Sequence, residues 1–536
     1  MHIRKIKIQG YKAFRDFELD LNKDLNIIVG DNETGKTTLL EAINLILSCQ
    51  IDGRNINYEL NPYIFNYGMV RDFFTALKKG MCPTPPQILI EAYLNDDEGN
   101  QLAKLRGTNN SAGEDCPGLY LKVELKEDFT DDFQAYTKLP ENPNIMPVEY
   151  YSVVWRSFAD NSVASRNLPF RASIIDTSLI RGYLGPNKYL SKIINECLDD
   201  KLQRALSMAY RKLKDTFVKE PGIQEINACL QTKKGDVTDK TIAVSMDMSA
   251  RSTWDTSITA HLDDMPFDSV GKGEQCRVQM KLAIEAACDS SILLIEEPEN
   301  HLSHSNMSRL IEDIANKCAD RQIVLTTHSS FVLNKLDIGN VKLLAMGNGT
   351  MTLNDLSSDT RDYFMKLPGY NTLRLILSPK NILVEGPSDE LVVQKAYKTL
   401  YGKLPLEDGV DVISVGALAF KRFLEIGKQL NLEICVVTDN DGDVAALKKK
   451  YNDYLDGKNK KIKICYDDDE ECPTLEPQLL KANTIEDMNK ALGKSFTNKE
   501  ELLNHMKKNK TDSALSIFNY ANKIKFPDYI HDAIKR

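Results

Sequence analysis

The stretch GDNETGKT, residues 30–37, matches the pattern G-x-x-x-x-G-K-[ST]. It follows an apolar run at Leu25–Val29 and precedes apolar residues at helical spacing from Thr37 to Ile46. A glycine-containing turn between a buried strand and a helix N-terminus is the setting in which backbone amides bind phosphate. The stretch therefore predicts a nucleotide-binding P-loop.

Each residue type in this loop has a chemical reason to be there. Gly30 and Gly35 allow backbone N–H groups to curl around phosphate oxygens. Lys36 is expected to neutralise the β- and γ-phosphates, and the Thr37 hydroxyl is expected to reach Mg²⁺. We also expect the neighbouring polar residues Asn32 and Thr38 to contact ATP·Mg²⁺.

Three later motifs supply what a P-loop still needs. Four apolar residues, ILLI, lead into Glu296, expected to assist Mg²⁺, and Glu297, expected to polarise the attacking water. His328, in TTHSS after another apolar run, is placed to sense the γ-phosphate. The segment SVGKGEQ puts Gly273 at a helix start, which is an anion site. Because Glu replaces the usual Asp at position 296, binding of ATP without rapid hydrolysis stays open.

The pattern around these motifs predicts an α/β architecture. Residues 3–21 alternate polar and apolar side chains as a strand hairpin does, and strand-like runs follow at 88–94 and 119–125. Residues 189–230 show long helical periodicity, and Thr241–Met246 is expected to return to the sheet as a strand. Helix and strand patterns then alternate regularly, which favours a parallel sheet.

A second set of acidic residues follows two apolar runs near the C-terminal end. ILVEGPSDE places Glu385 at a strand end and Asp389 one helical turn onward. ICVVTDNDGD places Asp439, Asp441 and Asp443 at the end of another strand. Carboxylates this close repel one another unless a cation neutralises them, and Mg²⁺ prefers such oxygen ligands. An EF-hand would need a bidentate Glu at position 450, where the chain has Lys.

The motifs resemble known families. The P-loop, EEPE and TTHSS resemble the ABC-type ATPases of the SMC and RecF kind, and the strand, E-G turn, helix, strand and D-x-D order resembles the Toprim domain. An ATPase followed by a Toprim domain is the architecture of the OLD (overcoming lysogenization defect) nucleases, and the chain is most similar to class 2 of that family. The segments CPTLEPQLL and KTDSAL also resemble family stretches.

The resemblance implies roles for the acidic residues and one lysine. Paired Mg²⁺ or Mn²⁺ ions would sit at Glu385, Asp389, Asp439 and Asp441, with Asp443 and Glu476 as auxiliaries. Lys510 would balance charge in the transition state, although Lys507 and Lys508 lie near it and one sequence leaves that alignment open.

The resemblance also implies the layout of the chain. It predicts an ABC/SMC-like P-loop ATPase head with an inserted helical dimerisation unit, followed by a C-terminal Toprim α/β domain. We expect the ATPase in residues 1–160 and 238–367, the helical insert in 161–237 and the Toprim domain in 368–536. Ordinary core helices are the alternative for the insert.

By resemblance, the expected function is ATP-regulated, metal-dependent DNA endonuclease activity in antiphage defence. The expected partners are double-stranded DNA, further copies in a homodimer or homotetramer, and a UvrD-like helicase subunit. The alternative is a RecF- or SMC-like DNA-binding ATPase, a clamp or repair factor, whose Toprim module is not catalytic. A topoisomerase or primase would need a DNA-gate tyrosine or a polymerase domain, which we do not identify.

Composition bounds these expectations. With 536 residues, 42% hydrophobic and 27% charged, the chain is globular and long enough for several domains. A net charge of -9 excludes a generally basic nucleic-acid coat and leaves room for local basic clefts. Eleven scattered cysteines predict reduced thiols, and the lack of a membrane-spanning apolar run or signal-peptide pattern predicts a cytoplasmic protein.

Overall fold

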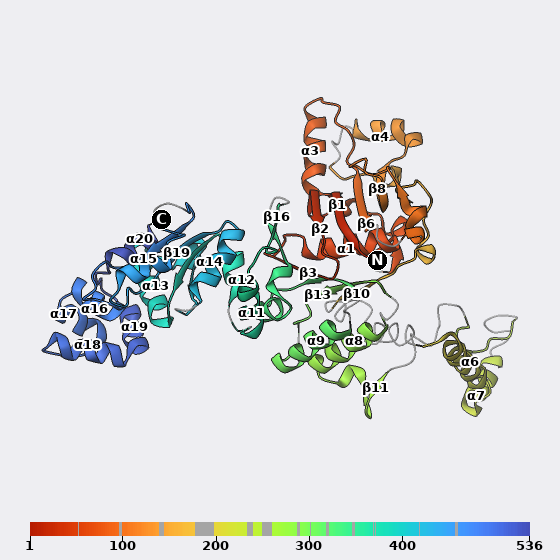
Figure 1. Cartoon of the computed structure of the whole chain (residues 1–536). Coiled ribbons are helices and arrows are strands. Elements are labelled where there is room, and N and C mark those ends of the chain that lie inside the picture. Colours follow the sequence, from red (N-terminus) through yellow and green to blue (C-terminus); the bar gives the residue numbers. More distant parts are fainter. Residues whose placement is uncertain are drawn as a thin grey trace. The chain divides into compact units, whose positions relative to one another are not determined.

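A computed structural model gives the fold, drawn in Figure 1. It describes residues 1–51, 53–95, 99–138, 144–176, 198–232, 240–248, 260–286, 290–300, 302–317, 321–345, 349–367, 369, 371–416, 419–455 and 459–535. The chain divides into two compact units. The first contains Met1–Leu25 and Thr37–Thr326, and the second contains Asn26–Lys36 and Thr327–Arg536.

The first unit begins with an antiparallel sheet. Strands β1 (Ile3–Tyr11) and β2 (Phe14–Asp20) form the predicted hairpin, with Ile6 opposite Leu19 and Ile8 opposite Phe17. All four of these side chains are buried because alternate residues of a strand face the same side. The remaining strands of the sheet are β6 (Ile88–Leu94), β7 (Arg106–Gly107), β8 (Cys116–Leu125) and β9 (Tyr151–Ser157).

Helices lie between several of these strands along the chain. Four of them have the bounds α1 (Lys36–Ser48), α2 (Ile56–Glu59), α3 (Tyr67–Lys78) and α4 (Thr130–Thr137). A small ribbon formed by β4 (Gln50–Ile51) and β5 (Arg54–Asn55) precedes α2. The predicted strands at 88–94 and 119–125 are confirmed as β6 and most of β8.

Parallel strands make up the rest of the ordered core of the first unit. Strand β13 (Ile292–Glu296) lies between β10 (Ala172–Asp176) and β14 (Gln322–Thr326), all in parallel register. Helices α8 (Lys272–Ala286) and α9 (His304–Lys317) pack against each other, so the predicted alternation of helix and strand is confirmed. Helices α6 (Asp200–Phe217) and α7 (Pro221–Gln231) lie in the predicted helical insert, of which residues 177–197 and 233–237 lie outside the described residues.

The expected strand at Thr241–Met246 is wrong. This segment has no strand pairing and lies along α7, where the Asn227 side chain accepts from the Val244 amide at 2.6 Å and donates to its carbonyl at 3.2 Å. Lys214 of α6 donates to the Asp247 carbonyl at 2.8 Å. Side chains of the helices thus satisfy the backbone groups that a sheet would otherwise pair. Further along the described chain, the two-residue strands β11 (His261–Leu262) and β12 (Met265–Pro266) pair as one ribbon.

In the second unit, strand β3 (Leu25–Gly30) pairs parallel with β15 (Val341–Ala345), which pairs antiparallel with β16 (Gly349–Thr352). Three helices follow in this part of the unit: α10 (Ser330–Lys335), α11 (Ser358–Lys366) and α12 (Thr372–Leu377). The buried Thr372 hydroxyl donates to the Asn334 side chain at 2.7 Å, joining α12 to α10.

A four-stranded parallel sheet forms the C-terminal part of the second unit. Its order is β18 (Val410–Ser414), β17 (Lys380–Val384), β19 (Glu433–Val437) and β20 (Ile462–Cys465). The helices of this part are α13 (Pro387–Tyr401), α14 (Phe420–Gln429), α15 (Val444–Lys450), α16 (Leu475–Ala482), α17 (Ile485–Leu492), α18 (Lys499–Lys508), α19 (Lys510–Asn519) and α20 (Asp528–Ile534).

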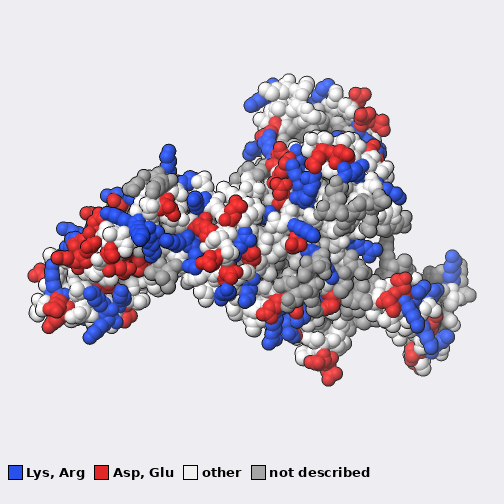
Figure 2. All heavy atoms as spheres, in the orientation of Figure 1, with Lys and Arg blue, Asp and Glu red and all other residues white. Residues whose placement is uncertain are grey.

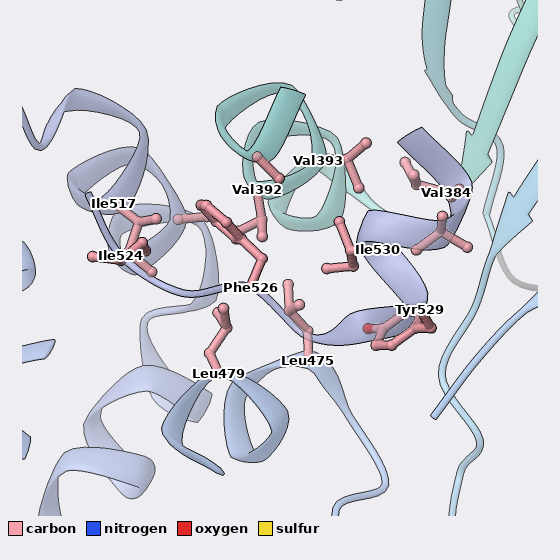
Figure 3. Packing of buried hydrophobic residues seen from close by; sticks show 14 of the residues in the cluster. Val384, Val392, Val393, Leu475, Leu479, Ile517, Ile524, Phe526, Tyr529 and Ile530 are labelled. Carbon is pink, nitrogen blue, oxygen red and sulfur yellow. The ribbon is translucent and has the colours of Figure 1, made fainter. Parts of the chain in front are cut away.

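The core of this part fixes the residues that matter below. Figure 3 shows Val384, Leu475, Ile530 and Phe526 in one apolar cluster. Val384 directly precedes Glu385, and Leu475 directly precedes Glu476. Because Val384 and Leu475 are packed in the core, the backbone positions of Glu385 and Glu476 are fixed as well.

Candidate functional site

Four carboxylates and one lysine line a single pocket of about 340 Å³ in the second unit. Strands β17 and β19 are parallel neighbours, so their carboxyl ends meet at one edge of the sheet and carry Glu385 and Asp439 there. Asp389 enters from the first turn of α13, Glu476 from α16 and Lys510 from the start of α19. The predicted residues that the structure brings together are Glu385, Asp389, Asp439, Glu476 and Lys510.

Hydrogen bonds hold Glu385 and Asp389 in place. Oε1 of Glu385 accepts from the Thr438 hydroxyl at 2.6 Å and from the Asp439 amide at 3.1 Å. Oδ2 of Asp389 accepts from the Gly386 amide at 3.0 Å. Two strand ends and the α13 N-terminus are thus tied through the carboxylates themselves.

Glu476 and Lys510 form an ion pair in the lining of the pocket. Glu476 is 4% exposed, accepts from the Thr474 hydroxyl at 2.8 Å and lies 3.4 Å from Nζ of Lys510. Lys510 lines the pocket, whereas Lys507 and Lys508 lie in the last turn of α18 and are not among the lining residues. A catalytic role for Lys510 stays a prediction.

Burial and mutual repulsion raise the pKa values of two of these carboxyl groups. Burial, followed by the charges of Asp389, Glu385 and Glu476, raises the pKa of Asp439 to about 8, and Lys510 opposes this. Burial and the Glu385 charge raise the pKa of Asp389 to about 6. Near neutral pH, Asp439 therefore favours its protonated form when no cation is bound.

These residues fit a divalent cation by donor type and charge. Carboxylate oxygens are the ligands Mg²⁺ and Mn²⁺ prefer, and a cation would relieve the repulsion that raises the two pKa values. Within the described residues, no group of three or more His, Cys, Asp or Glu side chains has the arrangement that holds a metal ion. The hydrogen bonds of Glu385, Asp389 and Glu476 to protein groups account for their present orientations.

Asp441 and Asp443 are exposed and do not line the pocket. The Asp441 amide donates to the Pro473 carbonyl at 3.2 Å, and the residue has a positive φ of 50°. Asp443 is the N-cap of α15 and accepts from the Ala446 amide at 2.8 Å. Metal roles for these two residues stay predictions.

Sequence reasoning missed two residues that shape the site. Thr438, 4% exposed, supports Glu385, and Asn440, 1% exposed, donates to the carbonyls of Asp467 and Asp469 at 2.8 Å each. Both flank Asp439 in the T-D-N motif. Polar side chains on either side of a strand-end acid were the available signal.

Part of the predicted nucleotide site lies in the second unit. Nζ of Lys36 donates to the carbonyls of Gly30 and Asp31 at 2.9 and 2.8 Å, so the ammonium is folded onto its own loop. A side chain at position 30 would clash with the Thr34 hydroxyl and the Leu344 carbonyl, which explains the glycine. Gly35 has φ +97°, and Asn32 and His328 are exposed.

The first unit holds the other part. The Thr37 hydroxyl donates to Oε1 of Glu296, which brings together the two oxygen groups expected at Mg²⁺ and fits that ion. Glu297 accepts from the Asn300 side chain at 2.9 Å and has a positive φ of 42°. Gly273 lies in the first turn of α8, and Thr38 in that of α1. That both groups act on one nucleotide stays a prediction.

Family models match three segments of the chain. Residues 1–98 match an AAA ATPase domain, residues 226–334 match a second AAA domain model, and residues 376–441 match the TOPRIM domain of overcoming lysogenization defect protein-like chains. The chain carries an AAA ATPase domain followed in the sequence by an OLD-like TOPRIM domain. The predicted order of domains and the α/β fold class are confirmed.

Curated relatives match the chain at low identity. Endonuclease GajA of Bacillus cereus (strain VD045) is 22% identical over 478 residues, covering 82% of this chain and 75% of that protein. An ATP/GTP phosphatase of Helicobacter pylori is 22% identical over 358 residues, covering 62% of this chain and 87% of that protein. The RecF protein of Halothermothrix orenii is 20% identical over 390 residues, covering 66% and 99%.

Among solved structures, the SMC head domain from Thermotoga maritima matches with a TM-score of 0.29 and 12% identity, covering 66% of this chain and 99% of that one. The Smc head domain from Pyrococcus furiosus matches with a TM-score of 0.35 and 13% identity, covering 68% and 99%.

Across the part of the chain that the structure describes, no helix has the length and apolar character needed to span a bilayer.

Proposed function

We propose that this OLD-like chain is a divalent-metal-dependent DNA endonuclease whose ATPase domain regulates cleavage. The observation that carries the proposal is the pocket at the carboxyl ends of β17 and β19, where Glu385, Asp389, Asp439 and Glu476 gather beside Lys510. Resemblance to endonuclease GajA over most of the chain supports DNA as the substrate.

The chain's own groups divide the work of phosphodiester hydrolysis. When bound at the carboxylates, Mg²⁺ or Mn²⁺ supplies activation of water and stabilisation of the leaving 3′-oxygen. Thr438 and the Asp439 amide fix the direction of the Glu385 carboxylate. Lys510, held 3.4 Å from Glu476, places a positive charge beside the pocket, where it balances negative charge developing on the phosphate.

ATP is the proposed regulator. Lys36 would exchange its bonds to the Gly30 and Asp31 carbonyls for bonds to phosphate, and Thr37 with Glu296 would hold Mg²⁺. Glu297 and His328 are the proposed residues for water activation and γ-phosphate sensing. Since Glu stands at position 296, sensing of ATP is the role we favour over rapid hydrolysis.

The proposal extends to biology through the resemblance to GajA. We propose a role in antiphage defence with double-stranded DNA as the substrate. We also propose assembly as a homodimer or homotetramer and a UvrD-like helicase as the partner. Copurification of the native complex tests the partner. A fully active, partner-free assembly from the source organism would count against the helicase.

The test of regulation is cleavage of supercoiled and linear DNA with Mg²⁺ or Mn²⁺, with and without ATP. We expect wild type to cut, Asp439→Ala to be inactive, and Lys36→Ala to cut with an altered response to ATP. Unchanged cleavage by Asp439→Ala, or an unaltered ATP response in Lys36→Ala, would contradict the proposal.

A RecF-like DNA-binding ATPase is the second candidate. The match to RecF of Halothermothrix orenii across 66% of this chain favours it. That candidate predicts DNA-stimulated ATP hydrolysis with no cleavage under any metal, whereas the endonuclease predicts cleavage that requires Asp439.

A further inference from the structure

The segment from residue 53, just before β5, to residue 87, just before β6, is unusual in composition. Six of the 35 residues from 53 to 87 are Phe or Tyr, about twice the frequency in the whole chain, which is 8% aromatic. The same segment has four basic residues, Arg54, Arg71, Lys78 and Lys79, and two acidic ones, in a chain whose net charge is -9. The segment is therefore rich in aromatic residues and poor in acidic ones.

Three of the tyrosines point into solvent. Tyr58, Tyr63 and Tyr67 are 87%, 83% and 76% exposed, whereas Ile64 and Phe65 between them are 3% exposed each. Exposing large rings to water without a partner brings no stability, so a cluster of them marks an interaction surface.

The backbone that presents two of these rings is well fixed. The Asn61 side chain accepts from the Tyr63 amide at 3.0 Å, and the Asn66 side chain accepts from the Met69 amide at 3.1 Å and donates to the Lys12 carbonyl at 2.8 Å. The rings of Tyr63 and Tyr67 are thus held outward by capped turns, not by a loose loop.

Both rings line one pocket of about 350 Å³ beside α3. The charged side chains of its lining are both basic: Arg71, whose guanidinium lies 6.0 Å from the centre of the Tyr67 ring, and Lys78. Figure 2 shows white and blue surface at the outer end of α3, with acidic side chains gathered over α4. Phosphate is the anion these cations suit, and flat rings suit unpaired bases.

We propose that this surface, Tyr63, Tyr67, Arg71 and Lys78, binds an unpaired stretch of DNA. The two rings stack on bases, which are available only where the duplex is open, while Arg71 and Lys78 contact the backbone. The inference deepens the proposed function, on which it rests, by giving the substrate a single-stranded segment bound away from the Toprim pocket.

The test is fluorescence anisotropy of the full chain with a labelled oligo-dT of about 20 nucleotides, longer than a typical single-strand site, in EDTA without nucleotide. We expect the double variant Tyr63→Ala/Tyr67→Ala to bind at least about tenfold more weakly than wild type. The matched variant Tyr63→Phe/Tyr67→Phe keeps the rings and is expected to bind as wild type does, as is Tyr58→Ala, whose ring does not line the pocket.

Several results would overturn the inference: no binding of oligo-dT by wild type, equal binding by the Ala and wild-type chains, or equal weakening by the Phe and Ala pairs. Equal weakening on a matched duplex would also overturn it, because stacking needs unpaired bases. Chelated metal keeps cleavage out of this assay. The proposed function is tested separately: it would be contradicted if wild type did not cut DNA with Mn²⁺.

Discussion

Asp439 is the residue on which the chemistry of the pocket depends. Among the carboxyl groups of the pocket, Asp439 has the most strongly raised pKa, because it is buried beside three other carboxylates. Its neighbours Thr438 and Asn440 are buried and hydrogen-bonded, so the loop cannot easily turn the charge toward solvent. Metal-free protein must therefore tolerate this charge, or take up a proton.

The stability of the metal-free protein should show this directly. The folded pKa of Asp439 is about 8 and its ordinary value is 3.8, so the folded state binds more protons between these pH values and loses stability as pH rises. Asp439→Asn removes the charge. In EDTA we expect the variant to have a melting temperature at least about 3 °C above wild type at pH 9, and a clearly smaller advantage at pH 5. Thermal scans at both pH values check this, and a pH-independent difference would contradict it.

Lys510 offers a test of charge balance. Lys510→Met should lower the DNA cleavage rate about 100-fold, because one preorganised positive charge beside the phosphate is lost. Lys508→Met, in the last turn of α18, is the matched control and should cut at the wild-type rate. Single-turnover rates measure both. Equal loss in the two variants would indicate a general effect of surface charge.

Packing of whole elements decides which parts of the site a sequence can reveal. Glu385 and Asp439 were predictable because parallel strands end at a common edge, and apolar runs mark the strands. Glu476 and Lys510 arrive on α16 and α19, whose positions depend on helix packing around the core of Figure 3 and leave no periodic signal. The error at Thr241–Met246 has a similar source, since alternating side chains also suit an extended segment bonded to Asn227.

The link between α12 and the Toprim sheet is an element-level prediction. Arg374 of α12 donates two hydrogen bonds to Asp411 of β18, which is 6% exposed, and a further one to the Val412 carbonyl. Arg374→Ala leaves a buried carboxylate without its cation and should cost about 3 kcal/mol of unfolding free energy. Urea unfolding measures the cost. Adding Asp411→Asn should recover part of it, and no recovery would contradict the pairing.

Taken as a whole, the molecule is acidic, yet its proposed substrate is a polyanion. A net charge of -9 means that DNA must be bound by local basic groups against an unfavourable overall field. We therefore expect the apparent affinity for DNA to fall by at least about tenfold between 50 and 200 mM salt, as a small number of phosphate contacts is lost. Anisotropy over a salt series measures the slope, and a salt-independent affinity would contradict binding through phosphate.

The most direct test of the endonuclease is single-turnover cleavage of plasmid DNA over a series of Mn²⁺ concentrations. The comparison is wild type, Asp439→Asn, and Asp468→Asn as a matched control, since Asp468 is exposed and outside the pocket. We expect wild type and Asp468→Asn to cut at the same rate and Asp439→Asn to show no cleavage at any Mn²⁺ concentration. Cleavage by Asp439→Asn at the wild-type rate would contradict the assignment of the active site to this pocket.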